Sequence, residues 1–481
     1  NVSIHSATLR NSSLMPSGPP IRVLVLFPGE WDEHALTELE AEGAITAFRE
    51  GFDVRRFPQC LKVIWFDAHR FLDQLCRKYR GRIDAVWSND EQFGCLLAAL
   101  LADRLSLPGT SPEVVVRAQH KLLMRQALAQ AVPDATVAAH ALPWQLRDAR
   151  WRDPEAIAAA VAALGLSWPL FFKPIKGTFS VLARRADSAQ DLAKQLRLSR
   201  VDHFSLRRLV RPFESLASRV IELPCPSDHL LVEQAMHGRQ VNVDGYARSG
   251  RIHILGIVDE CTYATRVGAQ HFMGFTYPSR WREPIRSKLV ATVTASLRAI
   301  GFDYGQFNVE LFVQDDGSVR VIEINPRAAA QFTTFYRDVE GRCLARDGIW
   351  LAAGRDPADL PRLPRVATTA ASVVWRRFDG CGIAAASVSG RRWLRETYPN
   401  ARLWLDDTSH RSVQRQYRWL GSYRYAVLNC SGDSLQELQS LSDECGQRLF
   451  GADAARPVIV GQVGGPAVGQ FAGQAARQMR G

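Results

Sequence analysis

The 481-residue sequence lacks the signals that would assign it at once to a membrane, secreted or disulfide-rich class. No apolar run reaches the ~20 residues that a membrane-spanning helix needs, so no membrane partner is predicted. Residues 1–20 lack the charged start and apolar core of a secretory signal, and we expect a disordered leader there. The nine cysteines contain no CxxC pair and are odd in number. This pattern favours free thiols and a cytoplasmic location.

Two further signals are missing. The Gly-x-Gly-x-x-Gly fingerprint is absent from the N-terminal part of the chain, so no dinucleotide site is predicted there. The formal net charge is +11, yet no long Lys/Arg tract concentrates it. Dispersed positive charge favours the attraction of small anions such as nucleotides over nucleic-acid binding.

The pattern of the first third predicts a parallel sheet. A buried strand is predicted at Ile21–Phe27 and further strands at Phe52–Phe57, Leu61–Phe66 and Ile83–Ser88, and they alternate with helical segments. Such alternation is typical of an α/β unit, which we place at 21–112. A helix that begins at Ser111-Pro112 is then predicted to run through Arg117–Ala138.

A hairpin is predicted within Gln306–Arg327, because two runs of alternating apolar and polar residues flank an Asp-Gly pair. With Asp316 and Gly317 as a two-residue loop, the register follows. Two pairs of polar residues then face each other, namely Glu310 with Glu323 and Asn308 with Asn325.

Facing carboxylates lie roughly 5 Å apart at Cβ and destabilise a strand pair. Cations between them would remove that cost, and Mg²⁺ favours carboxylate oxygens together with nucleotide phosphates. The alternative interpretation is a solvated hairpin face, because glutamates on exposed strands are common.

Basic residues upstream favour a phosphate site. Lys173 ends an apolar run, where an ammonium ion needs an anionic partner such as phosphate. The loop Ile175–Ser180 offers backbone N–H groups and hydroxyls that can cradle phosphate, although an ordinary hairpin turn has the same composition. Lys121 lies on the helix before it, and taken alone it is a typical surface lysine.

A long polar and aromatic segment, Glu260–Arg280, is predicted to be a loop that acts as a binding lid. Its residues Arg266, His271 and Arg280 are candidates for receiving a substrate carboxylate, with a surface position as the alternative for each. Farther along, strands are predicted at Cys381–Ala386 and Tyr425–Leu428, followed by a helix at Leu435–Phe450.

Four pieces in order, Lys121, Lys173, Glu233 and the stretch Val321-Ile-Glu-Ile-Asn-Pro-Arg327, resemble the ATP-grasp superfamily. The resemblance is to its carboxylate–amine ligase and biotin-carboxylase-like branch, and it covers about residues 20–450. It implies an α/β (α+β) class: an ATP-grasp fold with an N-terminal Rossmann-like parallel-sheet domain and a C-terminal β-rich domain.

The resemblance also implies domain boundaries. We expect a leader at 1–20, an N-terminal α/β domain at 21–112, an ATP-grasp domain at 113–365 with a lid subdomain at about 168–232, a C-terminal α+β domain at 366–460 and a flexible tail at 461–481.

For the site, the resemblance implies ATP with Mg²⁺ or Mn²⁺. The implied nucleotide contacts are Lys121, Lys173, the loop from Lys176 and Gly177 to Ser180, the adenine-binding segment Glu233, Gln234 and Met236, and Gln240 near the ribose. The implied metal ligands are Glu310, Glu323 and Asn325, and the implied catalytic residues are Arg327 and Lys173.

For the activity, the resemblance implies activation of a carboxylate as an acyl phosphate, attack by an amine and release of ADP. The substrates implied are a small carboxylic acid and an amine, of amino acid or short peptide type. Two departures from the family leave details open: Gln240 stands where a ribose-binding Glu is usual, and Ala328–Gln331 replaces the glycines that many members carry. The family often dimerises, and the sequence leaves that point open.

Three alternatives remain at this stage. A carboxylase that uses bicarbonate would share the nucleotide site, but the wide glycine-rich lid of that branch and a biotin-bearing segment are not visible. A non-catalytic nucleotide-binding module would not need the paired carboxylates. A nucleic-acid role would reveal itself by salt-dependent binding.

Overall fold

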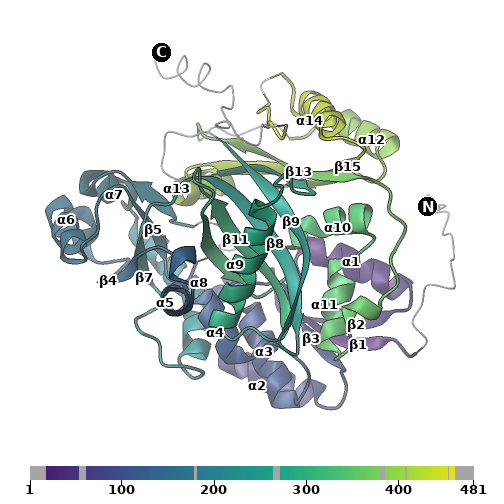
Figure 1. Cartoon of the computed structure of the whole chain (residues 1–481), viewed down its shortest axis with the longest axis horizontal. Helices are drawn as coiled ribbons and strands as arrows, with labels where there is room; N and C mark the ends of the chain where they lie inside the picture. The colour runs from purple at the N-terminus through teal and green to yellow at the C-terminus, as the bar shows by residue number, and fades with distance from the viewer. Residues whose placement is uncertain are drawn as a thin grey trace.

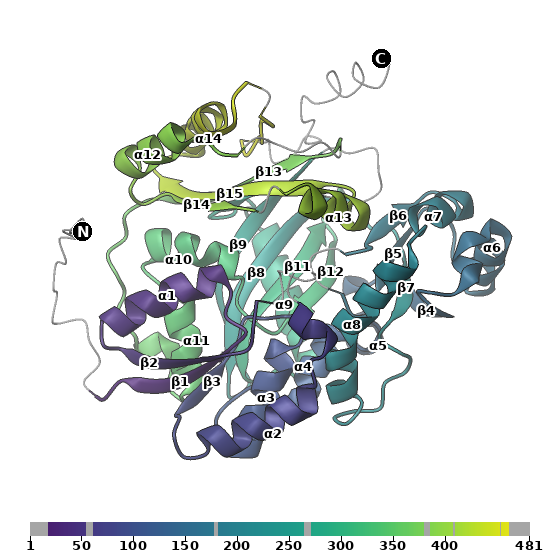
Figure 2. The same cartoon turned by 180° about the vertical axis from the view of Figure 1, so that it is seen from behind.

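The computed structural model describes residues 18–53, 61–177, 181–263, 271–379, 385–406, 409–452 and 454–460. The strands within these ranges form a three-stranded, an eight-stranded and a four-stranded sheet. Figures 1 and 2 show the eight-stranded sheet at the centre, with the two smaller sheets on separate sides of it. Most of the predicted strands Phe52–Phe57 and Cys381–Ala386, most of the predicted leader and all of the predicted tail lie outside the described residues.

The N-terminal sheet is parallel, as predicted, with β1 in the middle and the order β2-β1-β3. Its strands are β1 (Ile21–Leu26), β2 (Ile45–Glu50) and β3 (Ala85–Trp87), and its helices are α1 (Glu30–Ala41), α2 (Ala68–Tyr79) and α3 (Gly94–Leu105).

The predicted strand at Leu61–Phe66 is wrong. Leu61–Ile64 is a short 3-10 helix, and the second strand of the sheet lies earlier, at β2. Asp67 caps α2 by accepting hydrogen bonds from the backbone N–H groups of His69 and Arg70. Helix α2 therefore begins directly after this segment. The 3-10 helix that precedes it lies where the apolar composition suggested a strand.

The central sheet is antiparallel throughout, in the order β12-β11-β8-β9-β10-β13-β15-β14. Its strands are β8 (Arg239–Arg248), β9 (Arg251–Tyr263), β10 (His271–Tyr277), β11 (Gly305–Val313), β12 (Val319–Asn325), β13 (Thr369–Arg377), β14 (Arg402–Leu405) and β15 (Tyr423–Gly432). Helix α9 (Ile285–Ala299) crosses one face, where Leu289, Val293 and Leu297 are buried against the apolar side chains of β8, β11 and β12. The C-terminal strands β13–β15 thus extend the sheet that carries the hairpin.

The prediction of one long loop at Glu260–Arg280 is wrong over most of its length. Strand β9 continues to Tyr263, and β10 covers His271–Tyr277. The β9–β10 register shifts between Phe272 and Gly274. A Cβ at Gly274 would lie 2.8 Å from Ile459 and 2.9 Å from the Ser372 carbonyl, so this strand needs a residue without a side chain there. The bulge and the glycine interrupt the alternation of apolar and polar residues in the sequence of β10, which is the pattern by which strands are predicted.

The four-stranded sheet has the order β4-β7-β5-β6, with antiparallel neighbours. It consists of β4 (Ala139–Gln145), β5 (Leu170–Pro174), β6 (Arg184–Ala186) and β7 (His229–Gln234), accompanied by α6 (Pro154–Ala163), α7 (Ala189–Gln195) and α8 (Arg200–Ala217). The remaining helices are α10 (Thr333–Glu340), α11 (Leu344–Ala352), α12 (Val388–Thr397), α13 (His410–Leu420) and α14 (Leu435–Phe450).

Helices α4 (Pro112–Gln119) and α5 (Lys121–Ala131) replace the single helix that was predicted here. The chain turns at His120, whose backbone is extended, and the Lys121 N–H donates to the Ile175 carbonyl at 3.2 Å. This break starts a new helix at Lys121 beside the loop that follows β5.

The hairpin of β11 and β12 has the predicted pairing at the end away from its loop. Glu310 lies opposite Glu323, and Asn308 lies opposite Asn325. The predicted two-residue loop is wrong, because the Gln314 N–H donates to the Ser318 carbonyl at 2.9 Å and leaves three loop residues, the last being Gly317 at φ +75°. A bulge between Glu310 and Leu311 on one side and Glu323 and Val321 on the other restores the register.

Among the described residues, none of the helices combines the length and the apolar character that a bilayer crossing requires.

Gly341 and Gly43 provide a matched test of packing around the α10–α11 corner. Both have positive φ, but an added Cβ would lie 2.1 Å from the Leu363 carbonyl at Gly341 and would meet nothing within 4 Å at Gly43. Each Gly→Ala change costs about 1 kcal/mol for its left-handed backbone. We expect Gly341→Ala to lower the midpoint of thermal unfolding by at least about 4 °C more than Gly43→Ala does. Equal shifts would show that the corner adapts freely.

Candidate active site

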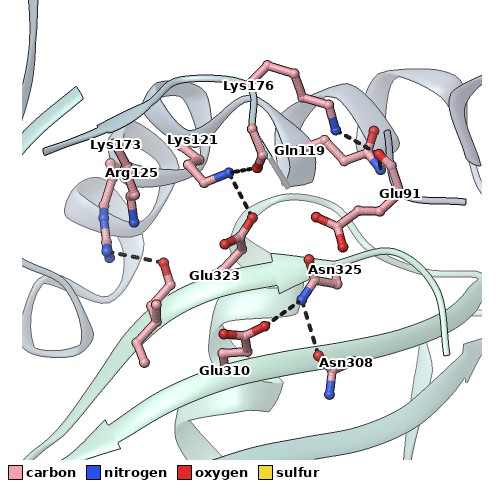
Figure 3. Close-up of polar contacts among 12 residues, drawn as sticks. Glu91, Gln119, Lys121, Arg125, Lys173, Lys176, Asn308, Glu310, Glu323 and Asn325 are labelled. Atoms are coloured by element: carbon pink, nitrogen blue, oxygen red, sulfur yellow. Dashed lines mark hydrogen bonds and ion pairs between the residues drawn. The ribbon is translucent and has the colours of Figure 1, made fainter. Parts of the chain in front are cut away.

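The paired carboxylates Glu310 and Glu323 lie side by side on neighbouring strands, where Figure 3 shows them below the helix that carries Lys121. The Glu310 carboxylate accepts hydrogen bonds from Gln240 Nε2 at 3.1 Å and from Asn325 Nδ2 at 3.3 Å. Burial raises the pKa of Glu310 to about 7, and the charge of Glu323 contributes to the increase. The pair is therefore a site of excess negative charge that a cation would relieve.

An amide network extends from this pair across the sheet. Asn325 Nδ2 donates to Asn308 Oδ1 at 3.1 Å, and Asn308 Nδ2 donates to Asn242 at 3.2 Å and to Asp244 at 3.0 Å. Asn242 in turn donates to Glu260 Oε2 at 3.3 Å. These bonds fix the orientation of the Asn325 amide, so that its side chain is held in place beside Glu310.

Sequence reasoning missed Asn242, Asp244 and Glu260. The signal was available, because polar residues at alternate positions of an otherwise apolar strand share one face of the sheet. Burial raises the pKa of Asp244 to about 6 and raises the pKa of Glu260 well above its usual range, with Glu310 adding to the latter effect. Buried acids of this kind on one face mark a functional surface.

Two of the predicted phosphate lysines lie close to the carboxylate pair. Lys121 Nζ is 2.8 Å from Glu323 Oε1 and donates to the Gly177 carbonyl at 2.7 Å, so it connects the hairpin to the loop after β5. Lys176 Nζ donates to the Glu91 carbonyl at 2.7 Å and lies 4.6 Å from the centre of the Phe213 ring. Burial lowers the pKa of Lys176 to about 8.

Lys173 and Glu233 form a buried ion pair, in which Nζ is 3.1 Å from Oε2. Arg125 Nε binds the other oxygen of Glu233 at 2.7 Å. Burial alone would raise the pKa of Glu233, but the charges of Arg125 and Lys173 outweigh it and lower this pKa to about 2. The Glu233 carboxylate is fully buried and holds two cations, and its assigned contact with adenine stays a prediction.

Arg125 is a site residue that sequence reasoning missed. It lies one helical turn after Lys121, on the same face of α5, and that spacing was the available signal. Besides Glu233, it donates to the carbonyls of Val321 at 2.6 Å and Ile322 at 3.2 Å. Its guanidinium thus joins the four-stranded sheet to β12, next to Glu323.

Arg327, the predicted catalytic arginine, forms an ion pair with Glu91, which precedes α3 and was also missed. Burial would raise the pKa of Glu91, but the charges of Arg327, Lys176 and Lys121 together outweigh this effect and lower it. The N-terminal domain therefore supplies a residue to the site, a contact between positions far apart in the sequence.

The other predicted nucleotide contacts lie around these groups. Gln234 ends β7 and donates from Nε2 to the Pro169 carbonyl at 3.2 Å, and Met236 is half-buried just after it. Gln240, predicted near the ribose, contacts Glu310. Ser180 lies outside the described residues. Whether these residues contact a nucleotide stays a prediction.

The side chains present fit a metal that is shared with phosphate. Among the described residues, no three His, Cys, Asp or Glu side chains form a complete ligand set. The two carboxylates and the Asn325 amide supply part of a set for Mg²⁺, which commonly takes its remaining oxygens from water and substrate phosphates. The raised pKa of Glu310 is the observation in favour of a cation here.

Comparison with known proteins identifies the fold. Residues 166–335 match the family model of the ATP-grasp domain. The structure is similar to that of an L-amino acid ligase from Bacillus licheniformis, with a TM-score of 0.63 and 17% identity over 90% of this chain and 98% of that one. The sequence finds no significant match among curated proteins.

Two other solved structures are similar at comparable coverage. A carboxyaminoimidazole ribonucleotide synthase from Aspergillus clavatus, complexed with ATP, gives a TM-score of 0.59 at 14% identity over 89% of this chain and 99% of that one. A biotin carboxylase from Campylobacter jejuni gives 0.53 at 14% identity over 89% and 92%. At such identities the likeness shows the fold, and the predicted resemblance to the ATP-grasp superfamily is confirmed.

The raised pKa of Glu310 leads to a test in the free protein. Because the folded state holds the Glu310 proton more tightly than the unfolded state, with a pKa of about 7 against 4.5, stability is lost as the pH rises through this window. Glu310→Gln removes that penalty. We expect its midpoint of thermal unfolding in EDTA to exceed that of the wild type at pH 8 and to equal it near pH 4.5. A lower midpoint at pH 8 would contradict the assignment of buried excess charge.

Proposed function

Because the chain carries an ATP-grasp domain, we propose that the protein is an ADP-forming ligase that joins a carboxylic acid to an amine. The observation that carries the proposal is the pair Glu310 and Glu323, held face to face beside Lys121 and Asn325. A site that only held adenine would not need paired carboxylates, whereas a reaction on the phosphates does.

The chemistry follows from the low reactivity of a carboxylate, whose leaving group would be oxide. A carboxylate oxygen attacks the terminal phosphorus of ATP, the bond to ADP breaks, and an acyl phosphate forms. An amine then attacks the acyl carbon and expels phosphate, giving an amide and releasing one proton. Mg²⁺ held by Glu310, Glu323 and Asn325 would neutralise phosphate charge when bound.

The protein's own cations have defined tasks in this proposal. Lys121 and Lys173 bind phosphate oxygens, and Arg327 stabilises the charge on the transferred phosphoryl group or the acyl phosphate. Each of the three now pairs with a carboxylate, Glu323, Glu233 and Glu91 respectively. The positions are supported by these ion pairs, because a cation that is already desolvated gains more from an incoming anion.

The substrates that we propose are an amino acid or short peptide and a second amino compound. The support is the similarity to an L-amino acid ligase, whose name states amino acids as its substrates. We also propose a cytoplasmic location, supported by the cysteines within the described ranges, all of which are free. A homodimer remains a proposal from family resemblance.

A carboxylase that uses bicarbonate is the second candidate, and the similarity to a biotin carboxylase favours it. The two reactions share the nucleotide site and differ in the electrophile: the ligase activates an organic acid, the carboxylase activates bicarbonate. ADP release in bicarbonate-depleted buffer across a panel of carboxylic acids and amines separates them.

The ligase proposal predicts that ADP release needs both an organic acid and an amine, and that hydroxylamine traps the acyl group as a hydroxamate when the amine is left out. Glu323→Gln should slow ADP release by more than about 100-fold, since it removes a direct metal ligand. Mass spectrometry of the product and a coupled ADP assay measure these outcomes.

Asp315→Asn is the matched control, because Asp315 lies exposed in the loop of the same hairpin and carries the same charge. It should retain wild-type turnover. Dependence on bicarbonate, or no ADP release with any substrate pair from a preparation that binds Mg-ATP, would overturn the proposal.

A further inference from the structure

Three buried basic side chains gather where the four-stranded sheet meets the C-terminal strands. They are Arg184 on β6, His271 on β10 and Arg376 on β13, with exposed fractions of 6%, 7% and 6%. We call them the basic cluster. The segment Trp419–Ser422, which runs from the end of α13 to the start of β15, contacts all three. Figure 2 shows α13 lying between the central sheet and β6.

Among the described residues, the guanidinium groups of the basic cluster have only neutral hydrogen-bond partners. Arg184 donates to the carbonyl oxygens of Ala183 at 3.0 Å and Trp419 at 2.7 Å. Arg376 donates to the Phe272 carbonyl at 3.2 Å and to Ser422 Oγ at 3.1 Å, and stacks on the Phe272 ring. Within the described part of the chain, neither arginine forms an ion pair with a carboxylate.

His271 completes the cluster. Its Nδ1 lies 3.2 Å from Ser422 Oγ, which already accepts a hydrogen bond from Arg376. In the tautomer in which the Ser422 hydroxyl donates to Nδ1, the imidazole proton lies on Nε2, where it is a further donor. Burial lowers the pKa of His271 to about 3, with contributions from Arg376 and Arg184, so the ring is neutral.

Two buried guanidinium ions without a counter-ion are costly. Burial lowers the pKa of both Arg184 and Arg376 to about 10. By contrast, the two arginines of the candidate active site, Arg125 and Arg327, are each paired with a carboxylate. An incoming anion would supply the partner that these two guanidinium groups lack among the described residues.

The basic cluster borders the active site through Glu260. This acid is hydrogen-bonded to Asn242 of the amide network, and its pKa responds to the charges of both Glu310 and Arg376. A molecule whose anionic group lies at the cluster would therefore extend along the sheet toward the carboxylate pair.

We propose that the basic cluster binds an anionic group, a carboxylate or a phosphate, on the amine substrate. The two guanidinium groups and the imidazole Nε2–H supply donors, and the planar fork of arginine suits either anion. The inference rests on the proposed ligase function and adds to it that the acceptor is an amine with a negative charge, such as an amino acid with a free carboxylate or an aminoalkyl phosphate.

A purely structural role is the alternative. Arg184 binds a carbonyl at the C-terminal end of α13, where a cation is stabilised by the helix dipole. That contact accounts for one arginine and leaves Arg376 and His271 unexplained. The experiment must therefore separate binding from folding.

The discriminating experiment compares acceptors that differ only in charge. The wild type should use an amino acid acceptor at least about 10-fold more efficiently, in kcat/KM, than the corresponding amino acid amide. Arg184→Met and Arg376→Met should reduce that preference toward unity, mainly by raising KM for the charged acceptor, with efficiency toward the amide nearly unchanged. An aminoalkyl phosphate of similar length tests the other anion, and the preferred one identifies the source.

Neighbouring arginines provide matched controls. Arg185→Met and Arg377→Met alter the adjacent residues of β6 and β13, each of which is paired with an aspartate nearby on its own strand or turn. Both should keep the wild-type preference. If all four variants keep it, or if Arg184→Met and Arg376→Met impair both acceptors equally, the basic cluster is structural and the inference fails.

A binding measurement distinguishes this failure from failure of the proposed function. Inorganic phosphate should raise the midpoint of thermal unfolding of the wild type, Arg185→Met and Arg377→Met more than that of Arg184→Met and Arg376→Met. That result without any ligase turnover would support an anion site and reject the ligase. Equal midpoint shifts in all five proteins, together with unchanged acceptor preference in an active ligase, would reject only the basic cluster.

Discussion

The structure depends on the forced proximity of Glu310 and Glu323 across two hydrogen-bonded strands. Facing acids destabilise the sheet, and partial burial makes the repulsion stronger. Neighbouring side chains reduce the repulsion between the two carboxylates in two ways. Lys121 contacts Glu323, and the amides of Gln240 and Asn325 bind Glu310. The compensation is incomplete, because the pKa of Glu310 remains raised, and this raised pKa is the support for the proposed metal site.

The fold meets this constraint by bringing three separate units to one place. The hairpin belongs to the central sheet, and Glu91 comes from the N-terminal domain. Lys121 and Arg125 come from α5, which begins where the helical segment is interrupted at His120. Arg125 joins these parts, because it binds Glu233 of the four-stranded sheet and the β12 backbone at the same time. Positioning therefore relies on buried ion pairs between units, each of which is firmly held only while its partner is present.

The sequence predicted features that depend on local patterns. The N-terminal parallel sheet and the pairing of Glu310 with Glu323 followed from alternation and turn chemistry, although a third loop residue and a bulge offset each other to produce that pairing. Features that depend on tertiary contacts were not predictable in this way. The ion pair of Arg327 with Glu91 joins residues 236 positions apart, and the bulge near Gly274 hid a strand within a segment that has loop-like composition. Arg125 lies between these extremes, since its spacing from Lys121 was visible but its partners were not.

The double contact of Lys121 has a consequence for how the site fills. Its ammonium group contacts the Gly177 carbonyl and the Glu323 carboxylate at the same time, so it supplies a positive charge between the end of β5 and the β11–β12 hairpin. If a polyphosphate and Mg²⁺ bind as proposed, Glu323 would hold the metal, and the Lys121 ammonium would leave Glu323 to bind phosphate oxygens. Binding would then exchange the partners of Lys121, and the Gly177 carbonyl would lose its hydrogen bond from Nζ only in the bound state.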